Sequence, residues 1–340
     1  YDKKGEEVTA GTPAFLPYMP NEAPMNRLGL ARWLVSKKHP LTARVAVNRE
    51  WQRLFGIGIV KTTEEFGAQG DWPSHPKLLD WLAVHFMNSG WDTKALLKFI
   101  VTSATYRQSS SATPELLVRD QANLLLARGP RHRLDAEIVR DNALAVSGLL
   151  VEKIGGPSVF PYHPKGLWQE LNNRPNYSRT YKQDKGEKLY RRSLYTYWKR
   201  TVPPPSMATF DAPEREFCLV RRSRTNTPLQ AFVMLHDPQF VEAARHLAER
   251  MMSASDNPDG CIEHGFRLAT SRLPNNKEKV VLHRLFRERL LFYRKDKKAA
   301  KAVLSVGESI RKVTLSEPEQ AAWTTVARAL LNLSETISKN

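Results

Sequence analysis

Apolar residues recur three and four positions apart over most of the chain, which is the spacing of amphipathic helices. Between residues 26 and 107 this spacing predicts four helices joined by short connections, and we expect them to pack against one another. Residues that favour helix starts or ends stand at the expected boundaries. They are Asn26, Thr42, Gly56, Pro76 and Asp92.

The same spacing predicts a long helix over residues 134–150 and a short helical stretch at 124–127. Five more helices are expected at residues 228–235, 238–252, 261–269, 277–293 and 318–333. Only residues 189–198 are aromatic and β-branched enough to favour a strand. We therefore predict a mainly α, irregular multi-helical fold with at most a small β element.

Two stretches lack a regular pattern. The first 25 residues contain four prolines, and we interpret them as a linker or docking arm. Residues 151–230 are rich in proline, arginine and aromatic residues, and so long an irregular segment is typically functional or mobile. Helical parts at 26–150 and 231–340 would flank it, as one domain or as two tightly packed subdomains.

The net charge of +17 is concentrated in two windows. Residues 165–224 contain 14 Lys or Arg against 6 Asp or Glu, and residues 272–312 contain 13 against 4, so that +8 and +9 account for the whole excess. A positive surface of this size attracts polyanions such as nucleic acid, anionic polysaccharide, lipid headgroups or an acidic protein. The alternative is that these cations are solvated on helices or paired with carboxylates inside the fold.

Several kinds of site find no support in the motifs. Cys218 and Cys261 stand outside any CxxC motif, and we interpret each as a small buried side chain, with a mutual disulfide as the less favoured alternative. The nine histidines show no HxxH or HExxH spacing, so neither a metal site nor a cofactor is predicted in this chain. Nucleotide-binding glycine motifs and a GxSxG elbow are missing, and no apolar run reaches the ~18 residues of a membrane span.

The irregular segment supplies most of the candidate site residues. Its arginines and aromatic rings could stack on sugars and hold sulfate, phosphate or carboxylate oxygens. The ligand-binding candidates are Arg191, Arg192, Tyr195, Tyr197, Trp198, Arg221, Arg222 and Arg224. The alternative is that these rings belong to the core. The catalytic candidates are the carboxylates of Asp211, Glu214 and Glu137, although a charge network is the simpler account of Glu137 and its helical neighbour Asp141.

Motifs spread along the chain resemble those of DUF1553, a planctomycete-specific domain family of unknown function. They cover about residues 11 to 333. The matching strings include NRL at 26–28, ARWL at 31–34, PLTARV at 40–45, VNR at 47–49, PSHP at 73–76, LLDWL at 78–82, SATYRQ at 103–108, RLDAE at 133–137, GGPSV at 155–159, residues 190–200, FDAP at 210–213 and RTNTPLQA at 224–231. Where the family usually has Asn-Asp-Pro, this chain has His236, Asp237 and Pro238.

The resemblance implies a context more than a reaction. Such domains usually form the C-terminal part of large exported proteins, with an upstream partner domain and often a c-type cytochrome domain, so that any haem would lie upstream and the chain would be periplasmic or extracellular. We therefore expect a non-haem accessory module that binds an anionic ligand such as a polysaccharide. The alternative is a hydrolase or redox-linked enzyme that uses carboxylates and arginines of the irregular segment. Nucleic acid ranks last among the partners, since no nucleic-acid-binding motif accompanies the charge.

Overall fold

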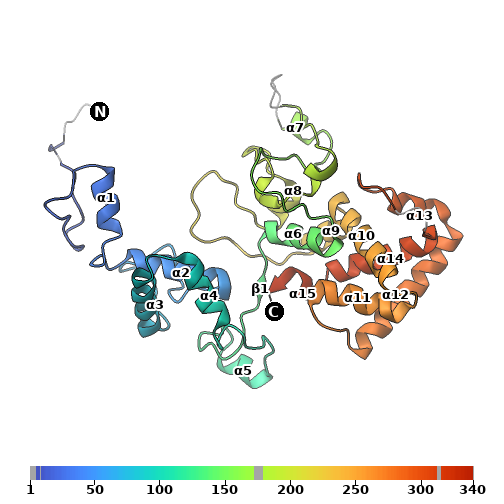
Figure 1. Cartoon of the computed structure of the whole chain (residues 1–340), viewed down its shortest axis with the longest axis horizontal. Helices are drawn as coiled ribbons and strands as arrows, with labels where there is room; N and C mark the ends of the chain where they lie inside the picture. The colour runs from blue at the N-terminus through green and yellow to red at the C-terminus, as the bar shows by residue number, and fades with distance from the viewer. Residues whose placement is uncertain (1–4, 8, 172–178, 312–314, 340) are drawn as a thin grey trace. The chain divides into compact units, whose positions relative to one another are not determined.

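The computed structural model describes residues 5–7, 9–171, 179–311 and 315–339. Among these residues it contains fifteen α-helices and a single two-stranded sheet, which confirms the predicted fold class. The chain forms two compact units, residues 1–132 and 133–339 (Figure 1). No helix in the described part of the chain is both long and apolar enough to cross a membrane.

The first unit contains the four predicted helices. They are α1 (Arg27–Leu34), α2 (Thr42–Phe55), α3 (Pro76–Asn88) and α4 (Thr93–Thr102). Asn26 and Asp92 cap α1 and α4 through side-chain oxygens that accept backbone N–H bonds, and Gly56 ends α2 with φ 84°. These boundaries follow the sequence because capping side chains satisfy backbone groups that a helix end leaves without partners.

Three of these helices share the core of the first unit. Buried side chains of α2, α3 and α4 form one apolar cluster, to which no described residue of α1 belongs. Instead, the Trp33 indole of α1 donates a hydrogen bond to the Pro17 carbonyl at 2.7 Å. A Cβ atom at Gly29 would lie 2.0 Å from the Pro24 carbonyl oxygen, so this close approach requires glycine. The prediction that all four helices pack together is therefore wrong for α1, which packs on the preceding proline-rich arm.

One short helix in the first unit was placed wrongly from the sequence. Residues 124–127 form turns, because the Asp120 carboxylate accepts hydrogen bonds from the Leu124 and Leu125 amides at 2.8 Å. The helix lies earlier, at α5 (Pro114–Arg119), where Thr113 caps the first turn. A side chain that bonds to nearby amides offers the backbone an alternative to helical hydrogen bonds.

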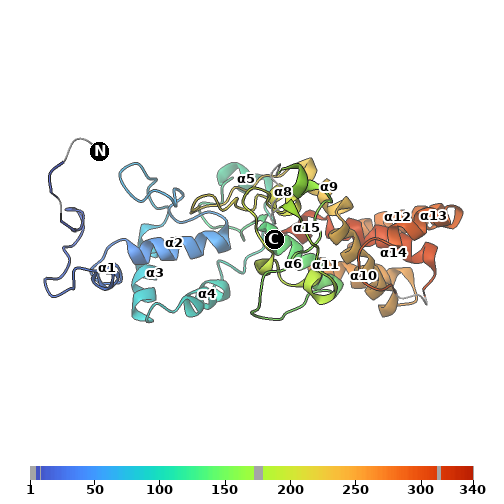
Figure 2. The same ribbon diagram turned by 90° about the horizontal axis from the view of Figure 1, so that it is seen from above.

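The second unit is a bundle centred on two helices. They are α10 (Pro238–Ala254) and α14 (Glu317–Leu331), which lie side by side (Figures 1 and 2). The helices that pack on them are α6 (Ala136–Ser147), α9 (Pro228–His236), α11 (Pro258–Thr270), α12 (Asn276–Lys295) and α13 (Lys297–Leu304). Buried alanines on both central helices allow close approach, and Trp323 stacks on Phe286 of α12 with ring centroids 4.0 Å apart. The remaining elements at the ends of this unit are β1 (His132–Arg133), α15 (Ser334–Ile337) and β2 (Ser338–Lys339).

The predicted strand at residues 189–198 is wrong. This stretch contains the 3₁₀ turns η2 (Gly186–Tyr190) and η3 (Ser193–Tyr195), with only isolated bridges to neighbouring described residues. Side chains of α6 take the hydrogen-bonding positions that a partner strand would fill. The Arg140 guanidinium donates to the carbonyls of Leu189 and Arg191 at 2.7 and 2.8 Å, and Asp141 accepts from the Ser193 amide at 2.7 Å.

The rest of the irregular segment carries two short helices, α7 (Leu167–Glu170) and α8 (Pro205–Thr209). Beyond α8, Cys218 lies on an exposed loop beside exposed Phe217 and Leu219. Cys261 is buried in α11, and both cysteines are free thiols. The prediction of a buried side chain is therefore confirmed for Cys261 and wrong for Cys218.

Candidate functional site

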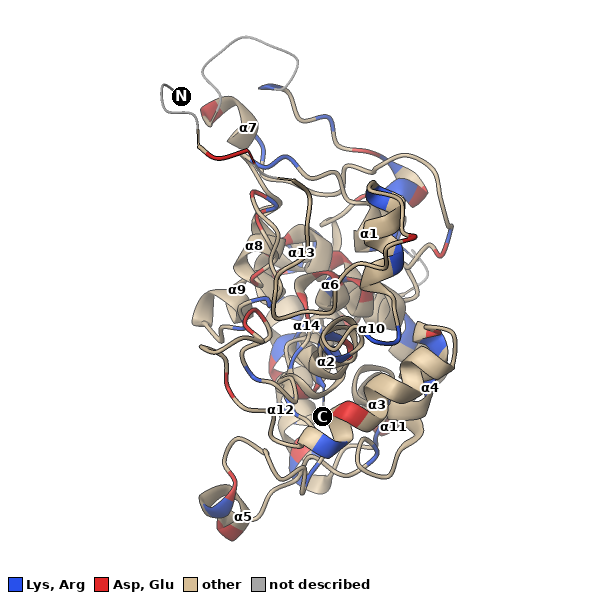
Figure 3. Cartoon of the chain, turned by 90° about the vertical axis from the view of Figure 1, so that its left-hand side faces the viewer, with Lys and Arg blue, Asp and Glu red and all other residues tan. Residues whose placement is uncertain are grey.

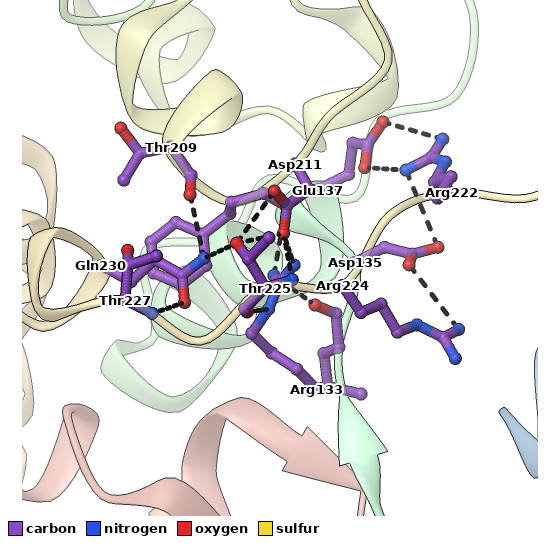
Figure 4. Close-up of polar contacts among 12 residues, drawn as sticks. Arg133, Asp135, Glu137, Thr209, Asp211, Arg222, Arg224, Thr225, Thr227 and Gln230 are labelled. Atoms are coloured by element: carbon purple, nitrogen blue, oxygen red, sulfur yellow. Dashed lines mark hydrogen bonds and ion pairs between the residues drawn. The ribbon is translucent and has the colours of Figure 1, made fainter.

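The predicted acid Asp211 lies at the centre of a polar cluster (Figure 4). It directly follows α8 and the turn that ends it, with a left-handed φ of 59°. Arg133 donates to its Oδ2 atom at 2.5 Å, and the Thr225 amide donates to the same oxygen at 2.8 Å. The Thr225 hydroxyl also lies 3.0 Å from Oδ1. Both carboxylate oxygens of Asp211 are thus engaged in joining β1, α8 and the loop before α9.

Three residues of this cluster were not recognised from the sequence as site residues. They are Arg133, Thr225 and Gln230. The Gln230 amide donates to the Thr209 carbonyl at 3.0 Å and to the Thr225 hydroxyl at 3.1 Å. Gln230 also forms a capping box with Thr227 at the start of α9. The Thr-Pro-x-Gln pattern at residues 227–230 is the sequence signal that could have located it.

The predicted cations Arg222 and Arg224 lie beside the first turn of α6. Arg222 forms two hydrogen bonds with the Glu137 carboxylate, at 2.7 and 3.2 Å, and its Nη1 lies 3.7 Å from Asp135. Burial opposes the charge of Arg222, but the hydrogen bonds from its guanidinium to Glu137 prevail and raise its pKa. Arg224 approaches Asp135 at 4.0 Å, and burial lowers its pKa. A predicted ligand-binding residue and a predicted catalytic acid, Arg222 and Glu137, are thus partners in one ion pair.

Arg191 is also enclosed. Its guanidinium donates to the carbonyls of Lys153 and Gly155 at 2.8 and 2.6 Å, and it lies 3.8 Å above the centroid of the Tyr195 ring. The Tyr195 hydroxyl accepts from the Gly155 amide at 2.8 Å. These contacts hold the loop around Gly155 against η3.

The other predicted residues are more exposed and lie in separate contacts. The Arg192 side chain is 52% exposed and approaches Asp141 at 3.7 Å. Tyr197 is 40% exposed. The Trp198 indole donates to the Glu214 carbonyl at 3.2 Å, so that the backbone of Glu214, rather than its carboxylate, makes this contact. Arg221 is exposed on the loop before Arg222. The eight predicted ligand-binding residues therefore do not share one set of contacts.

A protein-family model matches residues 26–286, and its description is "PSD1: Protein of unknown function (DUF1553)". The chain belongs to the DUF1553 family. The matched residues contain the whole Asp211 cluster and the first half of α12. Neither the curated proteins nor the solved structures include a match to this DUF1553 chain.

The second basic window of the DUF1553 chain differs from the first. Along α12 the apolar side chains of Leu282, Phe286 and Tyr293 face the core, and the basic side chains face outward. Nine exposed cations of α12 and α13 form no ion pair with any residue that the structure describes. They are Lys277, Arg284, Arg287, Arg289, Arg294, Lys295, Lys297, Lys298 and Lys301. Figure 3 marks Lys and Arg separately from Asp and Glu along the ribbon.

A buried network on α10 of the DUF1553 chain contains a serine next to a histidine. Ser309 Oγ lies 2.7 Å from His246 Nε2, 2.6 Å from Glu242 Oε1 and 2.6 Å from Arg245 Nη2. The Ser309 hydroxyl can thus donate to Glu242 while it accepts from Arg245 and, in the matching tautomer, from His246. These contacts hold Ser309 against α10.

Two tyrosines complete this network. Tyr162 and Tyr190 donate to the two oxygens of Glu242 at 2.8 and 2.9 Å. Burial, together with the nearby Glu242 charge, raises the pKa of Tyr190 to about 12 and also raises that of Tyr162. Gly307 lies beside Glu242 with φ 96°, and a Cβ atom there would be 2.3 Å from the carboxyl carbon. Throughout the described ranges, this network included, no group of three or more His, Cys, Asp and Glu side chains is arranged to hold a metal ion.

Proposed function

We propose that this DUF1553 chain binds an anionic polysaccharide through the basic face of α12 and α13. The observation that carries the proposal is the set of nine exposed cations on α12 and α13 that form no ion pair with the described residues. Cations fixed on a helix attract a polyanion and gain free energy when its condensed counterions are released. A polymer of sulfated or carboxylated sugars presents such charges repeatedly.

Arg191 and Arg222, the enclosed cations of the first window, are poorly suited to the same task. Withdrawing Arg222 from Glu137, or Arg191 from its carbonyl partners, would break hydrogen bonds to a charged group. Each such bond contributes about 1.5–3 kcal/mol, which an external anion would have to replace. The face of α12 and α13 carries no comparable cost, so the structure favours the second window over the first.

We expect removal of four cations from this face to weaken binding strongly. The variant combines Arg284→Gln, Arg287→Gln, Lys295→Gln and Lys298→Gln, all at exposed positions. Retention on immobilised heparin should shift to lower salt. The slope of log affinity against log salt should fall by about one for each of these cations that touches the polymer in the wild type.

The matched control removes the same charge from exposed lysines of the first unit. It combines Lys38→Gln, Lys61→Gln, Lys94→Gln and Lys98→Gln. If the control elutes as early as the α12–α13 variant, net charge rather than this face determines binding. Unchanged retention of a folded α12–α13 variant would also rule out the proposal.

We further propose that the chain works in an exported protein, next to upstream domains that include a c-type cytochrome domain. Membership of the DUF1553 family, together with the context that its sequence motifs imply, supports this placement. Fractionation of source cells with an antibody against this chain should find the full-length protein outside the cytoplasm, with a c-type haem spectrum after purification. A cytoplasmic, haem-free protein would contradict it.

A further inference from the structure

The irregular segment gathers five aromatic rings that neither the Asp211 cluster nor the basic face uses. Trp168 of α7 is at their centre, with the rings of Tyr181, His163 and Tyr197 at centroid distances of 5.1, 6.1 and 6.1 Å. Phe160 stacks on Tyr197 at 4.7 Å. The Lys199 ammonium lies 4.3 Å from the centroid of the Trp168 ring. Because Tyr197 is 40% exposed, this ring cluster reaches the surface.

Two polar atoms inside the ring cluster have no hydrogen-bond partner among the residues that the structure describes. Trp168 is only 6% exposed, and its indole N–H finds no acceptor there. The Nε2 atom of His163 is likewise buried without a described partner, and burial lowers the pKa of this imidazole. A buried unpaired donor costs about 1–3 kcal/mol, and native structures keep few of them. Two such atoms in one cluster would gain hydrogen bonds from a polar occupant.

The chemistry of the ring cluster selects the kind of occupant. The described rings meet Trp168 edge-on or tilted, at interplanar angles of 72°, 87° and 44°, so no pair of parallel rings among them brackets Trp168 for a flat aromatic ligand. A pyranose fits such surroundings, since its C–H faces pack on aromatic rings and its hydroxyl groups donate and accept hydrogen bonds. The Lys199 ammonium favours a sugar that carries a negative charge.

We propose that the ring cluster binds a uronic acid residue of a saccharide. The Trp168 N–H and His163 Nε2 would bond to its ring substituents, Tyr197, on which Phe160 stacks, would cover its apolar face, and Lys199 would lie near its carboxylate. This site does not depend on the basic face of α12 and α13, because none of its residues belongs to those helices.

Nuclear magnetic resonance of the indole N–H groups tests the proposal directly. The chain has eight tryptophans, and Trp168→Phe identifies the Trp168 resonance by its loss. The probes are short oligogalacturonates, neutral cello-oligosaccharides and sulfated oligosaccharides. We expect the Trp168 resonance to move with the uronate at concentrations at least tenfold lower than with the other two.

Three variants separate this site from the basic face and from a loss of folding. Trp168→Phe keeps an aromatic ring and removes only the N–H and the second ring, and we expect at least tenfold weaker uronate binding by calorimetry with an unchanged circular dichroism spectrum. Trp81→Phe, which changes an indole that is 50% exposed in the first unit, should bind normally. The α12–α13 variant with four cations removed should still show the Trp168 shift. A Trp168 resonance that no saccharide moves, or that moves equally with the neutral or sulfated sugars, would overturn the assignment.

Discussion

Replacing Glu242 with alanine should reduce the free energy of unfolding by about 3–5 kcal/mol, because it leaves several buried donors without their acceptor and removes one of the two carboxylates beside the buried Arg245. Glu242 is 1% exposed and accepts hydrogen bonds from Tyr162, Tyr190 and both the amide and hydroxyl of Ser309. Arg245, also 1% exposed, lies 3.7 Å away. Such a loss is a large part of the 5–15 kcal/mol that stabilises a typical domain. Urea unfolding followed by circular dichroism measures it.

Glu288→Ala is the matched control for this prediction. Glu288 lies exposed on α12 and forms no ion pair with the described residues. Its replacement should change the free energy of unfolding by less than about 0.5 kcal/mol. Equal effects of the two substitutions would mean that the network around Glu242 does not stabilise the second unit.

Arg140→Ala should have an effect of similar size for a different reason. The fully buried guanidinium donates to the carbonyls of Leu189 and Arg191, to the Ser193 hydroxyl and to Gln239. Burial lowers its pKa to about 10, which leaves it charged at neutral pH. Removing the guanidinium leaves two buried carbonyls without a donor and opens a cavity. We therefore expect the free energy of unfolding to fall by about 3–5 kcal/mol.

Hydrogen exchange distinguishes a local from a general effect of Arg140→Ala. The amides of Ser193 and Val151 are bonded in the segment that Arg140 fixes, and both should exchange faster in the variant. Arg289→Ala, at an exposed position of α12, should leave stability and exchange unchanged. If Arg140→Lys restored the wild-type stability, a point charge would suffice, and the planar geometry of the guanidinium would not be the cause.

The helices could be predicted because their information is local. Periodicity located α2, α4 and α10 to within a few residues, and the Asp92 cap fixed the start of α4, since both signals depend on neighbours three or four positions away. The strand predicted at 189–198 failed because its backbone partners are the side chains of Arg140 and Asp141, about 50 positions earlier. No pattern among neighbouring residues predicts a hydrogen-bond partner that lies so far away in the chain.

The candidate site shows the same limit. The sequence identified Arg222, Glu137 and Asp211 as candidate site residues. It did not show that Arg222 and Glu137, which are 85 positions apart, form an ion pair. The two basic windows carry almost equal excess charge in the sequence. Only the structure distinguishes them, because acids of α6 and backbone carbonyls engage much of the first window, while the second window lies on a helix whose outer side has few acids.

The fixation of Ser309 has a consequence for the helices that precede it. Because Ser309 is bonded to Glu242 and Arg245 of α10, the chain that leaves α13 is anchored to the core, and the cations of α12 and α13 stand at positions that the helices fix. With a rise of 1.5 Å per residue, Lys277, Arg284 and Lys295 on α12 are separated by about 10 and 16 Å along its axis. A flexible cationic tail would adapt to a polymer with any spacing of its charges. Cations at fixed positions would bind most tightly to a polymer whose negative groups recur at a matching interval.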